Sequence, residues 1–432
     1  MQTSLRLLGR RRFLPIFATQ FLGAFNDNLF KTAMVLFATY QVYSDPKAET
    51  QFNAIASGLF ILPFFLLSAL SGQLADTRDK AKIVRIVKTA EIFIMLVGAA
   101  GLLLPSIPLM LGAVLAMGVH SSFFGPIKYA ILPQHLEPEE VLGGTGLVEA
   151  GTYIAILAGT ITAGFITHDP QIAAAMVLLV ALLGWWTGRQ IPPAPPVHAE
   201  TGMDWHIIRA SVRLVSATMH IPRLFLAICS ISFFWTIGAV LVIEFPPLVK
   251  NVLTSNEQVA SLFLAVFSVG VAVGSVVINR LLKTEVSARY SPVSVIAMAG
   301  SVLAVYAIAK SWEGDAPGSL YTLAEFVEHP SAVALLLALF AVAVFGGMFV
   351  VPLYAFLTTT VDKDQTARTV AANNIVNSGA MVAGSLLAFA LSAIGVSAVD
   401  QLLMVSAMCF VSAGIAHRLN LACVEPAQPK TP

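Results

Sequence analysis

The stretch Gly72-Gln-Leu-Ala-Asp-Thr-Arg-Asp-Lys-Ala-Lys82 begins at the end of one long apolar run, 52–74, and leads into another, 84–104. Each run is long enough to cross a hydrocarbon core about 30 Å thick as a helix. The charged residues between the two runs must stay in water or in the lipid head-group region. This segment therefore predicts a helical hairpin of two membrane spans.

The composition extends this prediction to the whole chain. Of the 432 residues, 57% are hydrophobic and 11% are charged, against about 25% charged in an ordinary soluble domain. So few charges cannot cover the surface of a soluble protein of this length, which excludes the soluble enzymes. The net charge of +1 gives no reason to expect nucleic acid as a partner.

Apolar runs of this kind recur along the whole chain, and we predict twelve spans in an all-α polytopic membrane protein. The predicted spans are 13–40, 52–74, 84–104, 107–132, 142–167, 171–190, 223–249, 258–282, 291–310, 331–357, 369–393 and 398–418. Pro105, Pro170 and the proline cluster from Pro192 to Pro196 fall between spans, and Pro108 stands at the start of one, where helices should break or begin.

The basic residues predict the orientation of the chain. Both termini, the central linker and the loops after spans 2, 8 and 10 together hold 20 of the 25 lysines and arginines. The loops on the other side hold only Lys47, Lys250 and Lys310. By the positive-inside rule, both termini and the linker are cytoplasmic.

The chain also divides into two halves that echo each other. We predict a six-helix bundle over 1–190, a cytoplasmic linker over 191–222, a second bundle over 223–420 and a tail over 421–432. The best echo is Gly146-Leu-Val-Glu149-Ala-Gly151 in span 5 against Asn374-Ile-Val-Asn377-Ser-Gly379 in span 11. Matches at such an offset predict a parallel duplication of six spans.

At this point the sequence resembles known families. The stretch from Gly72 to Lys82 resembles the cytoplasmic loop motif of the major facilitator superfamily. Four segments resemble the bacterial lysophospholipid transporter family, which belongs to that superfamily. These are Gln20-Phe-Leu-Gly-Ala-Phe-Asn-Asp-Asn28, Gly125-Pro-Ile-Lys-Tyr129, Gly146-Leu-Val-Glu-Ala150 and Gly346-Gly-Met-Phe-Val-Val-Pro-Leu353.

The resemblance implies a major facilitator fold of twelve helices and no enzymatic activity or cofactor. It implies a monomeric secondary transporter of the bacterial inner membrane. Its substrate would be a lysophospholipid, chiefly lysophosphatidylethanolamine, taken from the periplasmic leaflet by alternating access for reacylation in the cytoplasm. An acyltransferase or acyl-carrier-protein synthetase is the partner that the resemblance implies.

Charged residues inside the predicted spans mark the candidate site. A charge at the middle of a bilayer costs about 3 kcal/mol even on the most lenient scale. Asp27 and Lys31 lie four residues apart in span 1 and share a helix face. This face either lines the substrate path or holds a purely structural ion pair of Asp27 with Lys31 or Lys128. We expect Glu91 to be interfacial, and we place Lys88 in the loop before span 3.

A zwitterionic head group fits these charges, with its phosphate at Lys128 and its ammonium at a carboxylate such as Asp27 or Glu149. The predicted head-group residues are Asp27, Asn28, Lys31, Lys128, Glu149, Tyr153 and Asn377. The predicted acyl-chain path is lined by Phe234, Trp235, Phe345 and Phe349, although aromatic residues at helical spacing are more often core packing.

Four residues are predicted to act in gating. Gly72, Asp76 and Arg78 belong to the loop motif, where we expect Asp76 to cap the helix that follows and to pair with a basic residue. Glu244, two residues before Pro246-Pro247, is expected near the periplasmic end of span 7.

Two other functions stay open. The first is a proton-coupled drug or metabolite antiporter in which Asp27 or Glu149 carries the proton, although the nearby lysines argue against it. The second is a sealed membrane scaffold for an acyltransferase. Cys229, Cys409 and Cys423 show no CxxC spacing, and the eight histidines do not cluster, so no metal site is expected.

Overall fold

The fold is described from a computed structural model. The structure describes residues 6–196, 205–282, 287–313, 319–361 and 366–424. Within these ranges the chain forms helices, with one isolated bridge between Ser255 and Tyr321 and no strand. Most of the predicted tail, from residue 425 on, lies outside the described residues, as do the loop lysines at 283 and 363.

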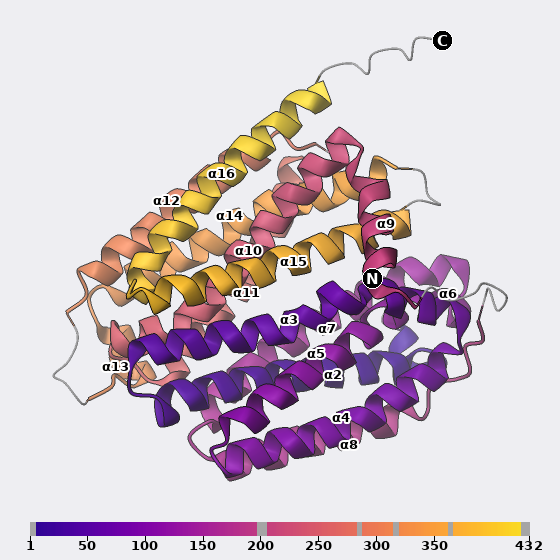
Figure 1. Cartoon of the computed structure of the whole chain (residues 1–432), viewed down its shortest axis with the longest axis horizontal. Helices are drawn as coiled ribbons and strands as arrows, with labels where there is room; N and C mark the ends of the chain where they lie inside the picture. The colour runs from indigo at the N-terminus through magenta and orange to yellow at the C-terminus, as the bar shows by residue number, and fades with distance from the viewer. Residues whose placement is uncertain (1–5, 197–204, 283–286, 314–318, 362–365, 425–432) are drawn as a thin grey trace. The chain divides into compact units, whose positions relative to one another are not determined.

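Residues 1–210 and Asn256–Ala265 form one compact unit, unit 1, and the remaining residues form unit 2 (Figure 1). The helices of unit 1 include six long ones and a short connecting helix. They are α2 (Leu14–Phe37), α3 (Pro46–Thr77), α4 (Lys80–Leu103), α5 (Ile107–Ala130), α6 (Leu132–His135), α7 (Pro138–Ile166) and α8 (Pro170–Gly188).

Unit 2 contains five long helices and the short α13, and two further helices of the chain cross the unit boundary. Those of unit 2 are α10 (Pro222–Asn251), α12 (Ser291–Lys310), α13 (Leu323–Glu328), α14 (Ala332–Thr359), α15 (Thr366–Ala393) and α16 (Ala398–Val424). The two that cross the boundary are α9 (Ile207–Met219) and α11 (Glu257–Leu281).

The twelve long helices confirm the predicted all-α membrane fold. Among the described residues, ten are long and apolar enough to span a bilayer. The other two are α2, where Asn26, Asp27 and Asn28 lower the hydropathy, and α7, whose described apolar part is the shorter Ala150–Ile166. Helix α3 begins six residues before the predicted span because Asp45 caps it and Pro46 occupies its first position.

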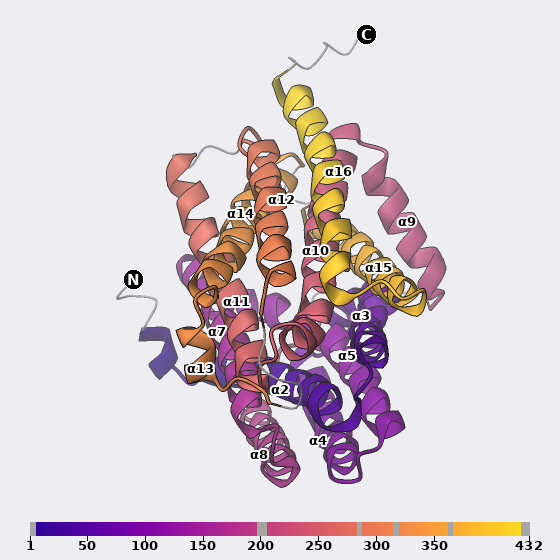
Figure 2. The ribbon, with the colours of Figure 1, turned by 90° about the vertical axis from the view of Figure 1, so that its left-hand side faces the viewer.

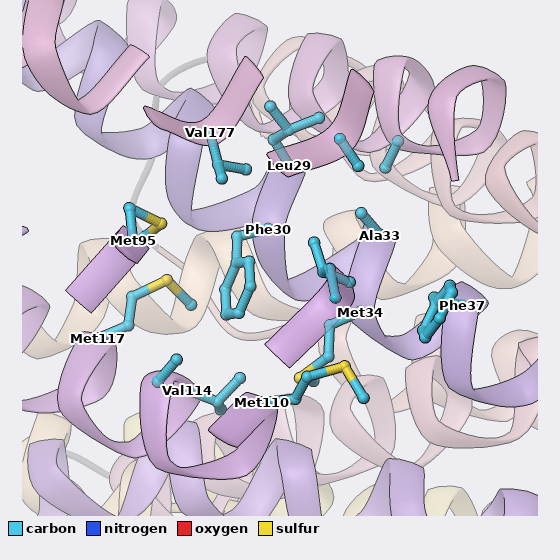
Figure 3. Packing of buried hydrophobic residues seen from close by; sticks show 14 of the residues in the cluster. Leu29, Phe30, Ala33, Met34, Phe37, Met95, Met110, Val114, Met117 and Val177 are labelled. Carbon is cyan, nitrogen blue, oxygen red and sulfur yellow. The ribbon is translucent and has the colours of Figure 1, made fainter. Parts of the chain in front are cut away.

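Unit 1 packs around α2, which contacts α7 and α8, while α3 pairs with α5 and α4 with α8. Its apolar core combines Phe30 and Met34 of α2 with Met95 of α4, Met117 of α5 and Val177 of α8 (Figure 3). Glycines allow close helix crossings, since a Cβ on Gly118 of α5 would strike the carbonyl of Phe60 in α3.

Unit 2 is built by the same kind of contact. Helix α10 packs against α14, α15 and α16, and α12 lies between α14 and α16 (Figure 2). A Cβ on Gly347 of α14 would strike the carbonyl of Val271 in α11, and one on Gly274 of α11 would strike the carbonyl of Val344. The crossing of α11 and α14 in unit 2 therefore repeats the crossing of α3 and α5 in unit 1.

The loop motif corrects one prediction. Helix α3 continues through Asp76 to Thr77, and α4 begins at Lys80. The cap of α4 is Asp79, whose carboxylate accepts from the backbone N–H groups of Ala81 and Lys82. The prediction that Asp76 caps this helix is wrong, because the break between the two helices lies two residues further on.

Candidate functional site

Unit 1 buries a closed network of charged side chains. The Lys88 ammonium lies 2.6 Å from Glu91 Oε2, and both side chains are at most 1% exposed. Asn26 Nδ2 donates to Glu91 Oε1 over 3.0 Å, and His120 Nε2 lies 3.3 Å from Glu91 Oε2. Lys88 also lies over the ring of Phe124, 5.2 Å from its centroid. Each charge in this network has a partner, as burial requires.

Small residues make the space for this ion pair. A Cβ on Gly23 of α2 would lie 2.6 Å from Lys88 Nζ, and one on Gly184 of α8 would lie 3.7 Å from it. Lys88 is the ninth residue of α4, so its assignment to the loop is wrong. The prediction that Glu91 is interfacial is also wrong, because Glu91 is enclosed by α2, α4 and α5.

Asp27 lies beside this network and is only partly satisfied. Ser121 Oγ donates to its Oδ2 over 2.6 Å, and His120 Nδ1 lies 3.3 Å from the same hydroxyl. Asp27 Oδ1 is buried and has no hydrogen-bond partner among the described residues. Lys31, one turn further on, lies 4.8 Å from the ring centroid of Phe60. Unit 1 therefore holds a satisfied ion pair and, beside it, a carboxylate oxygen that can accept another donor.

The remaining predicted head-group residues of unit 1 have separate contacts. Asn28 donates to the carbonyl of Ala24 in its own helix. Lys128 is half-buried near the end of α5 and takes part in an interaction of its own. Tyr153 is 63% exposed. The side chain of Glu149 lies outside the described residues, although its backbone belongs to α7.

Helices α2 and α7 are also joined by a polar contact. Gln20 Nε2 donates to Thr152 Oγ1 over 2.9 Å, and Thr152 in turn donates to the carbonyl of Val148. The predicted polar face of span 1 thus continues along α2 from Gln20 to Asp27. The bond between Gln20 and Thr152 depends on how α2 and α7 pack.

Unit 2 buries a neutral polar cluster where unit 1 buries the Lys88–Glu91 pair. Ser232 of α10 donates to Asn377 Oδ1 over 2.7 Å. The hydroxyl of Tyr354 in α14 accepts from Trp235 Nε1 over 2.6 Å and from Asn377 Nδ2 over 3.4 Å. Three helices therefore meet through uncharged side chains. Asn377 was predicted by its echo of Glu149, whereas Ser232 and Tyr354 were missed because isolated hydroxyls carry little sequence signal.

The predicted acyl-chain residues divide by burial. Phe349 is fully buried and Phe234 is 6% exposed, whereas Trp235 is 39% exposed. Phe345 is half-buried. Phe234 and Trp235 meet edge to face with their ring centroids 5.6 Å apart. Phe349 is thus a core residue of its unit, and Trp235 presents apolar surface next to the polar cluster.

The predicted gating residues lie in different surroundings. Arg78 is exposed at the end of α3, and a Cβ on Gly72 would meet no heavy atom within 4 Å in the described structure. Of the Asp76 side chain nothing is described. Glu244 is fully buried in α10, and neither carboxylate oxygen has a partner in the part of the chain that the structure describes.

Comparison with known proteins agrees with this architecture. The family model of the Major Facilitator Superfamily matches residues 16–385. The lysophospholipid transporter LplT of Salmonella newport (strain SL254) is 26% identical over 374 residues, which are 85% of each chain. The LplT protein of Salmonella typhimurium matches to the same extent.

Solved structures share the fold. A bacterial homologue of the human lysosomal transporter Spinster, inward-facing and unoccupied, is 13% identical and has a TM-score of 0.68, covering 97% of this chain and 99% of its own. A POT family transporter bound to a thioalcohol-conjugated peptide is 9% identical and has a TM-score of 0.72, covering 96% of each chain.

Proposed function

Because the chain belongs to the Major Facilitator Superfamily and is a membrane transporter, we propose that it moves lysophospholipids, chiefly lysophosphatidylethanolamine, across the bacterial inner membrane. The similarity to the LplT proteins supports this substrate class. The arrangement of charges in unit 1 supports a zwitterionic head group.

One observation carries the proposal. The Lys88–Glu91 pair is closed by its own partners, but Asp27 Oδ1 is buried without one. A buried carboxylate oxygen that lacks a donor costs free energy, and a primary ammonium would supply that donor. We assign the ethanolamine nitrogen of the head group to Asp27.

The phosphate needs a cation near the same carboxylate. Lys31 follows Asp27 by one turn of α2, and Lys128 lies in α5, which also supplies Ser121 to Asp27. A lysine binds phosphate as a point charge without fixed geometry, which suits a head group that must be released again. We propose Lys128 as the main phosphate ligand and Lys31 as its neighbour.

The remaining parts of the proposal concern direction and partners. We propose that lysophospholipid enters from the periplasmic leaflet, that both termini are cytoplasmic and that the monomer works by alternating access. An acyltransferase or acyl-carrier-protein synthetase would then restore the second acyl chain. The predicted gating role of Gly72, Asp76, Arg78 and Glu244 belongs to this same proposal.

The test is translocation of labelled lysophosphatidylethanolamine in proteoliposomes. Asp27→Asn should reduce transport by about 10-fold or more, since a hydrogen bond to a charged group is worth about 1.5–3 kcal/mol. Lys128→Ala should reduce transport of both lysophosphatidylethanolamine and lysophosphatidylglycerol, because both carry the phosphate.

Lys310 and Asp400 provide matched controls. They form an exposed ion pair, 2.8 Å apart, in unit 2. Lys310→Ala and Asp400→Asn make the same charge changes and should leave transport unchanged. Full transport of both lipids by Lys128→Ala would refute the phosphate assignment, and full transport by Asp27→Asn would refute the ammonium assignment.

Glu244 favours a second candidate function, proton-coupled antiport. A buried carboxyl without a cationic partner is the kind of group that carries a proton in transporters, and Glu244 has no described partner. If this candidate is correct, a protonophore should abolish transport and Glu244→Gln should make transport insensitive to it. Lysophospholipid uptake that continues without a proton gradient would exclude it.

A further inference from the structure

Helix α9 (Ile207–Met219) is an amphipathic helix in the segment that joins the two bundles. The sequence predicted only a linker here. With 13 residues, α9 is about 20 Å long, shorter than the hydrocarbon core. It also contains Arg209 and Arg213. Helix α9 therefore cannot cross the membrane.

The outward side of α9 carries two adjacent stripes. The first is apolar: Ile208 and Val212 lie one turn apart and are 73% and 60% exposed, and Trp205 just before the helix is 69% exposed. The second is basic: Arg209 and Arg213, also one turn apart, are both exposed. An apolar stripe flanked by arginines is the pattern of helices that lie in a membrane interface.

The connection to α10 keeps α9 at the membrane surface. Only His220 and Ile221 separate α9 from α10, a membrane-spanning helix that begins at Pro222. Ile221 has extended backbone and Pro222 cannot continue a helix. The chain therefore turns between the two helices, and Figure 1 shows α9 inclined to α10 and not in line with it. The C-terminal end of α9 is thus held within a few residues of a span's end.

The end of α8, the span that precedes α9 in the chain, also carries residues typical of a membrane interface. Arg189 follows α8 and its guanidinium lies 4.7 Å from the ring centroid of Trp185. Tryptophan and arginine at the end of a span are typical of the membrane–water interface. The segment that contains α9 therefore follows a span whose end carries interfacial residues.

We propose that α9 lies in the plane of the membrane surface and binds acidic phospholipids. In this arrangement Trp205, Ile208 and Val212 insert at the boundary of the acyl chains, and Arg209 and Arg213 contact anionic head groups. The charge of the stripe decides the ligand, because two arginines beside exposed apolar residues favour a negatively charged lipid surface over a zwitterionic one. This binding surface is separate from the transport site and does not depend on the transported substrate.

The test uses the full-length protein in nanodiscs whose lipids have brominated acyl chains, which quench tryptophan fluorescence at short range. The contribution of Trp205 is the difference between the wild type and Trp205→Phe. We expect strong quenching of Trp205 in nanodiscs that contain phosphatidylglycerol, and weaker quenching in pure phosphatidylcholine or at high salt. Arg209→Gln and Arg213→Gln should each lower the ratio of bound to detached helix about five-fold.

Trp186 is the matched control. It is 60% exposed in α8, a membrane span, so its quenching, measured against Trp186→Phe, should not depend on the lipid charge or on Arg209 and Arg213. An unchanged Trp186 signal also shows that the arginine variants are folded. The proposal would be overturned if, in phosphatidylglycerol nanodiscs, the brominated lipids did not quench Trp205 and iodide in the water did quench it. Equal quenching in both lipids, unaffected by the arginine variants, would overturn its acidic-lipid part.

Discussion

The two units pack their helices by similar close crossings but bury different polar groups. Unit 1 combines the close crossing of α3 and α5 with a buried network of Lys88, Glu91 and His120. Unit 2 combines the close crossing of α11 and α14 with the neutral cluster of Ser232, Tyr354 and Asn377. The comparison shows that small residues allow the close helix contacts in both units, whereas the buried polar groups differ between them.

The largest expected effect concerns the buried ion pair of unit 1. Lys88→Met leaves Glu91 charged and buried, and should lower the free energy of unfolding by about 3–5 kcal/mol. Chemical denaturation of the purified protein in detergent measures this. Removing both charges in Lys88→Met/Glu91→Leu should recover most of the loss. Lys310→Met, which breaks an exposed pair in unit 2, should leave the free energy of unfolding nearly unchanged, because solvent screens exposed pairs. Equal effects of the two lysine variants would contradict the comparison.

The glycine contacts should respond alike in both units. Gly118→Ala and Gly347→Ala each push a methyl group into a neighbouring backbone carbonyl, and each should cost about 1–3 kcal/mol of stability. The controls are Gly112→Ala and Gly300→Ala, where an added Cβ meets no described atom within 4 Å. Thermal unfolding in detergent compares the four variants. A loss confined to one unit would break the structural parallel.

The neutral cluster of unit 2 should contribute less than the ion pair of unit 1. Tyr354→Phe removes the hydroxyl that accepts from Trp235 and Asn377, and should cost about 1 kcal/mol. Tyr306→Phe in α12 makes the same chemical change away from this cluster and should have little effect. A Tyr354→Phe cost as large as that of Lys88→Met would show that the neutral cluster matters as much as the charges.

The smallest effect is expected at the surface of unit 1. Arg12 lies 3.1 Å from Glu137 and 2.6 Å from Glu140. Arg12→Gln should cost between about 0.2 and 1 kcal/mol at low salt, and the cost should shrink as salt screens the pair. Denaturation at two salt concentrations measures it. A cost that does not change with salt would show that Arg12 contributes through packing.

Much of the fold was predictable because lipid imposes a simple rule on sequence. A run of apolar residues must be a helix that crosses the bilayer, so the limits of spans such as 291–310 agree with the observed helix. The family resemblance rests on short segments such as Gly72 to Lys82. This segment is easy to recognise because its charged residues lie between two apolar runs.

The polar contacts were harder to predict because they depend on helix rotation. Asp27 and Lys31 were located by their spacing, but the bond from Ser121 to Asp27 joins residues 94 positions apart. Lys88 was assigned to a loop because it lies near other basic residues, although Glu91, three residues later, was a signal that the two form a pair inside one helix. The transport roles of the predicted site residues stay predictions.

That spacing has a consequence for how the protein is made. Lys88 and Glu91 belong to the same helix, α4, and form their pair between positions three residues apart. Their charges can therefore neutralise each other while α4 is being synthesised, before α2 and α8 pack against it. At this point of α4 the translocon would meet a pair without net charge, and the pair would cause little delay in the insertion of the helix into lipid.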